Sequence, residues 1–379
     1  MKGVTIKSGL IVFCALMIYF FSFFTAIAEE VLINSYYGKY IADRKISGFP
    51  SKSLKGPKIE KWHMPKPKKP YHIGVLFPHI KDSYFNTANY GIISHAKKLG
   101  LKVTLYTAGA YINFGNQRMQ LKHLADNIKV DGILITSVDF KKMDPFIKQV
   151  SDAGIPVVAL INDIYTPAIS AKVFASFFNI GYKIGEYVLN DSADKDIKIA
   201  FFPGPENSEW APETYHGFIA AVSKLTPKGK KVTILEPLYG DTRPDVQILR
   251  LNTLNIQKHH GINYIVGNAV AAVEAVKYLR EQNKIHPRAE IISTYITITV
   301  HEQLKKGHIK AAPYDQTISQ CKIALDMMVK ILNGEEPGKD FPFLIYPKIS
   351  LIFSDNIDQF SYESFFGEKD FIPIFKEID

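Results

Sequence analysis

Five aromatic residues stand just after predicted strands, in the loops where α/β proteins usually place a ligand. These residues are Tyr84, Phe85, Tyr111, Trp210 and Tyr295. Aromatic faces attract cationic groups by roughly 0.5–2 kcal/mol for each ring, and the tyrosines add hydroxyls that can donate hydrogen bonds. The set therefore indicates a cage for a small ammonium-like group.

Several residue types that often bind ligands are absent from the loop that carries Trp210. The stretch PGPENSEWAPETYHGF, residues 203–218, contains no Lys, Arg or Cys and no glycine-rich phosphate cradle. Two acidic residues, Asp82 and Asp315, occupy similar positions near predicted strand ends. They could balance a bound cation or orient tyrosines, although Asp82 fits equally well as the N-cap of the helix that follows it.

Other reactive groupings are sparse in this chain. The 11 histidines are scattered, and the adjacent pair His259 and His260 does not have metal-ligand spacing. The sequence has no G-x-S-x-G, P-loop or C-x-x-C motif and no convincing acid–base pair of carboxylates. We therefore expect a binding protein with no catalytic activity, no metal and no cofactor.

The N-terminus has the order of a secretory signal. Two lysines precede an apolar run over residues 10–25, and an A-x-A site follows before Glu29. We expect cleavage after Ala28 and a periplasmic location; the alternative is an uncleaved anchor, for which the run is short. Cys14 lies in the signal, so the mature chain keeps only Cys321, which excludes an internal disulfide and fits a core position.

The formal net charge of +9 is concentrated near the N-terminus, in residues 52–69. Residues 29–70 are rich in Lys and Pro, and we expect a solvated basic arm. The alternative is a tail that docks on a membrane surface or an acidic partner. Nucleic acid is not an expected partner of an exported protein.

Strands and helices alternate with short connections from residue 71 onward. The expected strands of the first series are 72–78, 101–107, 131–137 and 155–162, with helices at 83–100, 115–129 and 141–154. The second series has helices at 178–190, 211–224, 245–259, 269–283 and 317–334 and strands at 196–202, 231–237, 263–268, 290–295 and 309–313, followed by 343–347 and 350–353. This pattern predicts two doubly wound parallel-sheet lobes with a cleft between them.

The spacing of these segments resembles that of the type I periplasmic binding proteins, a family of two-lobed, hinged ligand binders. That resemblance implies three crossings between the lobes, near 162–163, 294–295 and 314–315. We accordingly expect 71–162 and about 288–314 in the first lobe, and 163–287 and about 335–355 in the second. Residues 315–334 would form a helix near the crossover and 356–379 a C-terminal tail.

Several longer strings resemble the TorT-like subfamily of that family. They are YTAGAYIN, FFPGP followed by Trp210, YGDT followed by a Gln, YIVGNAVAAVEA, IISTYIT and KAAPYDQ. TorT-like proteins detect trimethylamine N-oxide, so the resemblance implies an aromatic box at Tyr84, Tyr111, Trp210 and Tyr295. Phe85 stands where the subfamily would have Trp, which keeps a ring but weakens its attraction for a cation.

The resemblance also bears on function and partners. The positions where sugar binders of the family carry Arg, Asn-Asp and F-D-x-T are occupied here by aromatic residues and alanine, which disfavours a polyol. The expected function is a periplasmic receptor for trimethylamine N-oxide or a similar methylated amine. Its partner would be the periplasmic domain of a TorS-like sensor histidine kinase, which would also supply the only membrane contact. The alternatives are the solute-binding component of an ABC transporter for a sugar or betaine-like solute, and an enzyme acting on the N-oxide.

Overall fold

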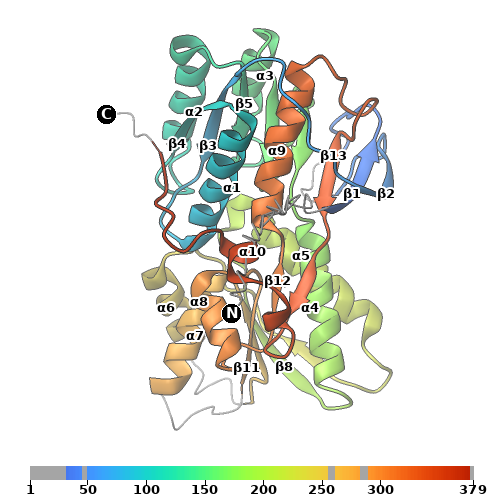
Figure 1. Ribbon diagram of the computed structural model, residues 1–379. Coiled ribbons are helices and arrows are strands. Elements are labelled where there is room, and N and C mark those ends of the chain that lie inside the picture. Colours follow the sequence, from blue (N-terminus) through green and yellow to red (C-terminus); the bar gives the residue numbers. More distant parts are fainter. Residues whose placement is uncertain (1–30, 45–48, 255–260, 282–288, 376–379) are drawn as a thin grey trace, which may run out of the picture. The chain divides into compact units, whose positions relative to one another are not determined.

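The computed structural model describes residues 31–44, 49–254, 261–281 and 289–375 (Figure 1). The expected signal peptide with Cys14, and the pair His259 and His260, lie outside these residues. Within the described ranges, none of the helices is both long and apolar enough to cross a bilayer.

The first sheet has eight strands in the order β2-β1-β13-β7-β6-β5-β3-β4. Its parallel strands are β3 (His72–Phe77), β4 (Lys102–Thr107), β5 (Gly132–Ile135), β6 (Val157–Leu160), β7 (Ala171–Val173) and β13 (Leu344–Pro347). All residues of β5 and β6 are buried, as expected for aliphatic parallel strands covered on both faces. Helices α1 (Ser83–Leu99) and α9 (Thr317–Leu332) cover one face, and α2 (Phe114–His123) and α3 (Asp144–Asp152) cover the other.

The second sheet is wholly parallel, in the order β11-β10-β8-β9. Its strands are β8 (Ile197–Phe202), β9 (Val232–Ile234), β10 (Tyr264–Gly267) and β11 (Glu290–Ser293). One face is covered by α4 (Phe177–Asp191) and α5 (Trp210–Leu225), and the other by α6 (Pro244–Thr253), α7 (Ala269–Glu281) and α8 (Ile298–Lys305). A bridge from Ile292 to Ala311 joins β11 to β12 (Ala312–Tyr314), which pairs antiparallel with β14 (Ser350–Ile352). The predicted fold class is confirmed.

The segment expected to be a basic arm contributes two strands to the first sheet. Strand β1 (Leu32–Tyr37) lies antiparallel to both β13 and β2 (Lys55–Lys61), so the arm prediction is wrong for these residues (Figure 1). The partner of β1 stands about 310 residues later in the chain, which local patterning cannot reveal. Strand β2 forms the edge of the sheet, and its exposed lysines fit the protection that natural sheet edges require.

The expected lobe boundaries need correction. We call the first sheet with its helices the first lobe, and the second sheet with its helices the second lobe. Residues 290–314 belong to the second lobe, because β11 pairs with β10, and β13 belongs to the first, because it pairs with β7. The described chain crosses between the lobes after β7, at Asp315–Gln316, after β13 and again before Ile374 in the tail; the crossings expected near 162–163 and 294–295 are absent. Parallel strands look alike in sequence, so spacing alone could not assign each to its sheet.

The C-terminal tail is also structured. Helix α10 (Tyr362–Phe366) packs on His301 of α8 through Phe365 and Phe366. Ile374 then exchanges two backbone hydrogen bonds with the Asn89 side chain on α1, of 2.8 and 2.9 Å. The tail therefore contacts both lobes.

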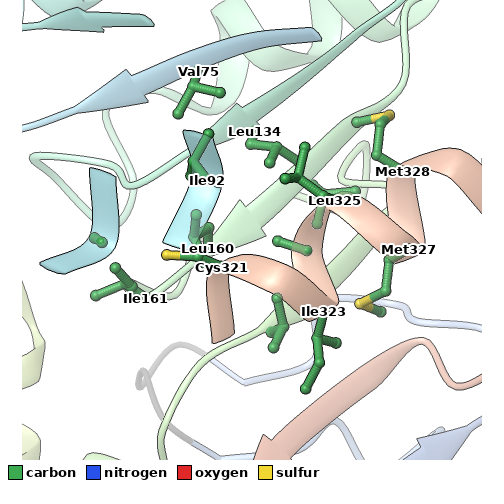
Figure 2. Close-up of a cluster of buried hydrophobic side chains, with 14 of the residues drawn as sticks. Val75, Ile92, Leu134, Leu160, Ile161, Cys321, Ile323, Leu325, Met327 and Met328 are labelled. Carbon is green, nitrogen blue, oxygen red and sulfur yellow. The ribbon is translucent and has the colours of Figure 1, made fainter. Parts of the chain in front are cut away.

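Cys321 lies in the core of the first lobe, as expected. It is fully buried on α9 among Ile92, Leu160 and neighbouring aliphatic and methionine side chains (Figure 2). A Cβ placed on Gly91 of α1 would lie 2.8 Å from the Cys321 Cβ. The close approach of α1 and α9 therefore depends on a small residue at position 91.

Candidate functional site

A small cavity lies at the carboxyl ends of the strands of both sheets. About 40 Å³ of it is open to the centres of water-sized molecules. Its lining includes all seven residues singled out from the sequence, Asp82, Tyr84, Phe85, Tyr111, Trp210, Tyr295 and Asp315. The remaining lining residues are His79, Ile161, Asn162, Phe177, Ile180, Thr214, Thr242 and Thr294. The structure thus brings the predicted residues together; their contact with a ligand stays a prediction.

The rings around the cavity form a nearly continuous wall. Successive ring centres lie 5.9 Å apart from Trp210 to Tyr295, 5.5 Å from Tyr295 to Tyr84 and 5.4 Å from Tyr84 to Phe85. Phe85 is followed by His79 at 4.8 Å, and His79 by Tyr111 at 5.6 Å. Each pair meets edge to face, at interplanar angles of 73–87°.

The hydroxyl of Tyr111 nearly closes this wall. Burial raises the pKa of Tyr111, and the approach of Asn162 and then of Trp210 to its hydroxyl acts to lower it. The indole nitrogen of Trp210 does not reach full hydrogen-bond geometry with this hydroxyl. The same hydroxyl accepts a 3.3 Å hydrogen bond from Asn162 Nδ2, so its own proton is available to a bound molecule.

The position of Trp210 follows from glycines that allow close packing. Gly204, at φ +122°, carries the loop past the indole, where an added Cβ would lie 2.6 Å from the ring. Further along, α5 approaches α4 so closely that a Cβ on Gly181 would lie 1.8 Å from the Thr214 carbonyl oxygen. The PGP stretch and the small residues of α4 therefore hold Trp210 against the cavity.

Tyr84 and Asp315 form a buried pair although they stand 231 residues apart in the chain. The Tyr84 hydroxyl donates a 2.6 Å hydrogen bond to Asp315 Oδ2, and Thr317 donates one of 2.9 Å to Oδ1. Burial raises the pKa of both groups, while the two hydrogen bonds act to lower that of Asp315. The pair orients the Tyr84 ring and places a carboxyl group beside the cavity.

Asp82 serves in two ways. It is the N-cap of α1 and accepts a 3.2 Å hydrogen bond from the Phe85 backbone N–H, as the capping alternative predicted. It also lines the cavity, half-buried beside His79. Burial lowers the pKa of His79, which favours its neutral form. With Asp82 and Asp315 present and no Lys or Arg in the lining, the cavity suits a cation better than an anion.

Backbone strain gathers around the cavity. Ile161, Glu209 and Gln316 have φ values of 64°, 63° and 57°, which residues other than glycine rarely adopt. Ile161 lines the cavity, Glu209 precedes Trp210, and Gln316 follows Asp315. Strained backbone of this kind is commonly found at ligand clamps, where the surrounding structure maintains it.

Sequence reasoning missed His79, Asn162 and Thr294 as cavity residues. Asn162 and Thr294 stand at two of the expected crossings between the lobes, and the sequence assigns no role to His79. All three lie within two residues of the ends of β3, β6 and β11. The rule that selected the aromatics, applied to polar residues as well, would have found them once those strand ends were known. Phe177 and Ile180 come from the start of α4, where no strand-end signal exists.

A comparison with known families accounts for this architecture. The model of the periplasmic binding protein domain family matches residues 73–336. The chain belongs to the periplasmic binding protein family. Membership of this family of ligand binders indicates a periplasmic location.

The chain is also similar to individual proteins and solved structures. The chain is 28% identical to periplasmic protein TorT of Escherichia coli K12 over 78% of this chain and 81% of that protein. An ABC transporter solute-binding protein from Bradyrhizobium sp. BTAi1, solved with Bis-Tris bound, is 29% identical, with a TM-score of 0.75 over 91% of this chain and 98% of its own. The complex of TorT with the TorS sensor domain in the presence of trimethylamine N-oxide is 24% identical, with a TM-score of 0.69 over 81% and 100% of the two chains; it shows the shared fold.

The residues around the cavity fit the binding of a small molecule. Among the described residues, no group of three or more His, Cys, Asp or Glu side chains could hold a metal ion. What the lining offers is aromatic faces, carboxyl groups and a few hydrogen-bond donors.

Proposed function

We propose that this protein is a periplasmic receptor for trimethylamine N-oxide or a similar small methylated amine, acting without catalysis. The observation that carries this proposal is the wall of aromatic rings around a cavity whose lining also includes two carboxyl groups and no Lys or Arg. Such a cage stabilises a methylated cationic nitrogen through the ring faces and the nearby negative charge.

The size of the cavity supports the same class of ligand. A space of about 40 Å³ open to water-sized centres holds only a few water molecules or a handful of heavy atoms. A pentose or hexose would need the lobes to separate. Its ring would also have to fit between closely spaced aromatic side chains, whose centres lie 4.8–5.9 Å apart.

We further propose that ligand binding is reported to a sensor histidine kinase of the TorS kind. The support is the similarity to TorT, together with a cavity whose lining residues follow strands of both sheets. A ligand held by residues of both lobes stabilises the closed arrangement, and a partner that contacts both lobes reads the change.

A second candidate is the solute-binding component of an ABC transporter. It is favoured by the similarity to the Bradyrhizobium solute-binding protein, which covers a larger share of this chain than the similarity to TorT. The same cavity would then deliver a methylated amine or betaine to a permease.

Calorimetric titration of the protein purified from the periplasmic fraction tests the ligand. Trimethylamine N-oxide, trimethylamine, glycine betaine and ribose are compared on the wild type and on Trp210→Ala. We expect the N-oxide to bind and the variant to lose it. Binding of ribose alone would reject the proposal.

A deletion strain separates the receptor from the transporter. A receptor is required for N-oxide-dependent gene expression driven by the kinase, whereas a transport component is required for uptake of the labelled solute. Loss of uptake with normal induction would replace the first candidate by the second.

A further inference from the structure

Three polar atoms at the cavity lack hydrogen-bond partners within the described residues. They are His79 Nδ1, Trp210 Nε1 and Thr294 Oγ1. All three residues line the cavity, and their exposed fractions are 6%, 7% and 3%. A buried donor without a partner is costly, so such atoms usually face a ligand or an ordered water.

The three atoms share the ability to donate. An indole nitrogen is only a donor, a threonine hydroxyl can donate, and the Nδ1 of a neutral imidazole donates in one tautomer. Burial favours the neutral form of His79. The ring faces and ionised carboxylates, in contrast, offer nothing to an acceptor, and the Tyr111 hydroxyl is a further donor of the lining.

The residues that carry these donors come from both lobes. His79 follows β3 of the first sheet, Thr294 follows β11 of the second, and Trp210 begins α5. A single acceptor atom that reaches donors of both lobes would join them, whereas a purely apolar cation would be held only by the rings. The donor set thus distinguishes ligands that carry an oxygen from those that do not.

We propose that His79, Trp210 and Thr294 form a subsite for an oxygen atom attached to, or adjacent to, the methylated nitrogen of the ligand. This inference rests on the proposed function and deepens it. It makes the oxygen, and not the cationic head, the feature that the protein selects.

Two matched probes test the subsite. Trimethylamine N-oxide and tetramethylammonium have nearly the same shape, but the second carries a methyl group in place of the oxygen and a net positive charge. The two carboxyl groups of the lining favour that charge, so a preference for the N-oxide reports contacts to its oxygen. We expect the wild type to prefer the N-oxide by at least tenfold, because each hydrogen bond to a buried donor left unpaired by the analogue contributes to the difference.

The variant Thr294→Val keeps the shape of the side chain and removes its hydroxyl. It should weaken N-oxide binding by about five- to thirtyfold, leave tetramethylammonium binding within about twofold, and be rescued by Thr294→Ser. His79→Leu should act in the same direction. Circular dichroism and thermal unfolding establish that each variant is folded before its affinity is compared.

The outcomes separate the two proposals. Binding of neither probe would overturn both the proposed function and the subsite. Equal affinity for the two probes, or an equal loss of both in Thr294→Val, would overturn the subsite alone and leave the aromatic cage. Loss of the N-oxide preference in Thr294→Val with recovery in Thr294→Ser supports it.

Discussion

Two buried clusters of this protein contain the same residue types and differ in how their polar atoms are satisfied. In the first lobe, Asp326 Oδ1 on α9 lies 2.7 Å from His95 Nε2 on α1. Its Oδ2 accepts a 2.8 Å hydrogen bond from Trp62 Nε1. In the cavity, His79 and Trp210 also lie near carboxyl groups, but His79 Nδ1 and Trp210 Nε1 have no such partner among the described residues.

The difference indicates which cluster is structural. Satisfied polar networks rigidify a core, and unsatisfied ones are costly unless another molecule completes them. The His95–Asp326–Trp62 cluster ties the segment after β2 to two helices. The cavity cluster is incomplete in the protein alone. Mutations in the first cluster should therefore change stability, and mutations in the second should change affinity.

The largest effect is expected at Asp326. Asp326→Ala removes the acceptor of both His95 and Trp62 and leaves one buried and one partly buried donor unpaired. The free energy of unfolding should fall by about 3–5 kcal/mol in urea titrations. Affinity for the N-oxide should be retained by the folded fraction. A variant as stable as the wild type would contradict the structural assignment of this cluster.

Glu213 sharpens the comparison, because its Oε2 is also buried without a hydrogen-bond partner, yet it does not line the cavity. Burial, with added repulsion from Glu209 and Asp163, raises its pKa from 4.5 to about 8. The folded protein therefore holds a proton that the unfolded chain loses between these pH values. Stability should fall as pH rises from 4.5 to about 8, by about 1.4 kcal/mol per pH unit at most, and this contribution should level off above 8.

Glu213→Gln mimics the protonated acid and should remove this slope. Urea unfolding at pH 5.5, 7 and 8.5 measures it, with Glu302→Gln at an exposed position as the matched control. An unchanged slope in Glu213→Gln would mean that another group, and not Glu213, titrates in this pH range.

The two tryptophans provide a direct exchange test. Trp210→Ala should weaken N-oxide binding by about 10- to 100-fold, since it removes one cage wall and one donor. Trp62→Ala should lower stability and leave affinity within about twofold, because Trp62 donates to Asp326 away from the cavity. Calorimetric titration gives the affinity of each variant, and urea denaturation gives its stability. Loss of affinity in Trp62→Ala, with unchanged affinity in Trp210→Ala, would contradict the assignment of the two clusters.

Tyr84 belongs partly to each kind of cluster, because its hydroxyl is paired and its ring lines the cavity. Tyr84→Phe keeps the ring and leaves Asp315 with the hydrogen bond from Thr317. We expect a loss of about 1–2 kcal/mol in unfolding free energy and only a few-fold loss in affinity. Tyr182→Phe on α4, where the ring contacts Phe178, is the control and should be nearly neutral.

The smallest effect is expected at Phe85. Phe85→Trp restores a stronger cation-binding face and should tighten N-oxide binding about two- to fivefold, whereas Phe85→Leu should weaken it. Phe85 is 3% exposed, so thermal unfolding accompanies the titration to detect overpacking. Weaker binding in a fully stable Phe85→Trp protein would show that this ring does not face the cation.

The sequence by itself determined the alternation of strands and helices, the caps of α1 and the aromatic strand ends. These features depend on local spacing: aliphatic runs form β5 and β6, Asp82 caps α1, and Gly100 ends it at φ 67°. Because parallel strands present their carboxyl ends at one edge, strand-end residues such as Trp210 and Tyr295 could be selected before their positions were known.

Only the tertiary structure decided which strands share a sheet and which polar atoms are paired. Strand β1 finds β13 across nearly the whole chain, and β11 joins the second sheet, because hydrogen-bond partners and buried faces are chosen globally. The sequence around His79, Thr294 and Glu213 does not show whether their polar atoms have hydrogen-bond partners. Whether a buried polar atom is satisfied depends on groups that other segments bring beside it, and that is a property of packing.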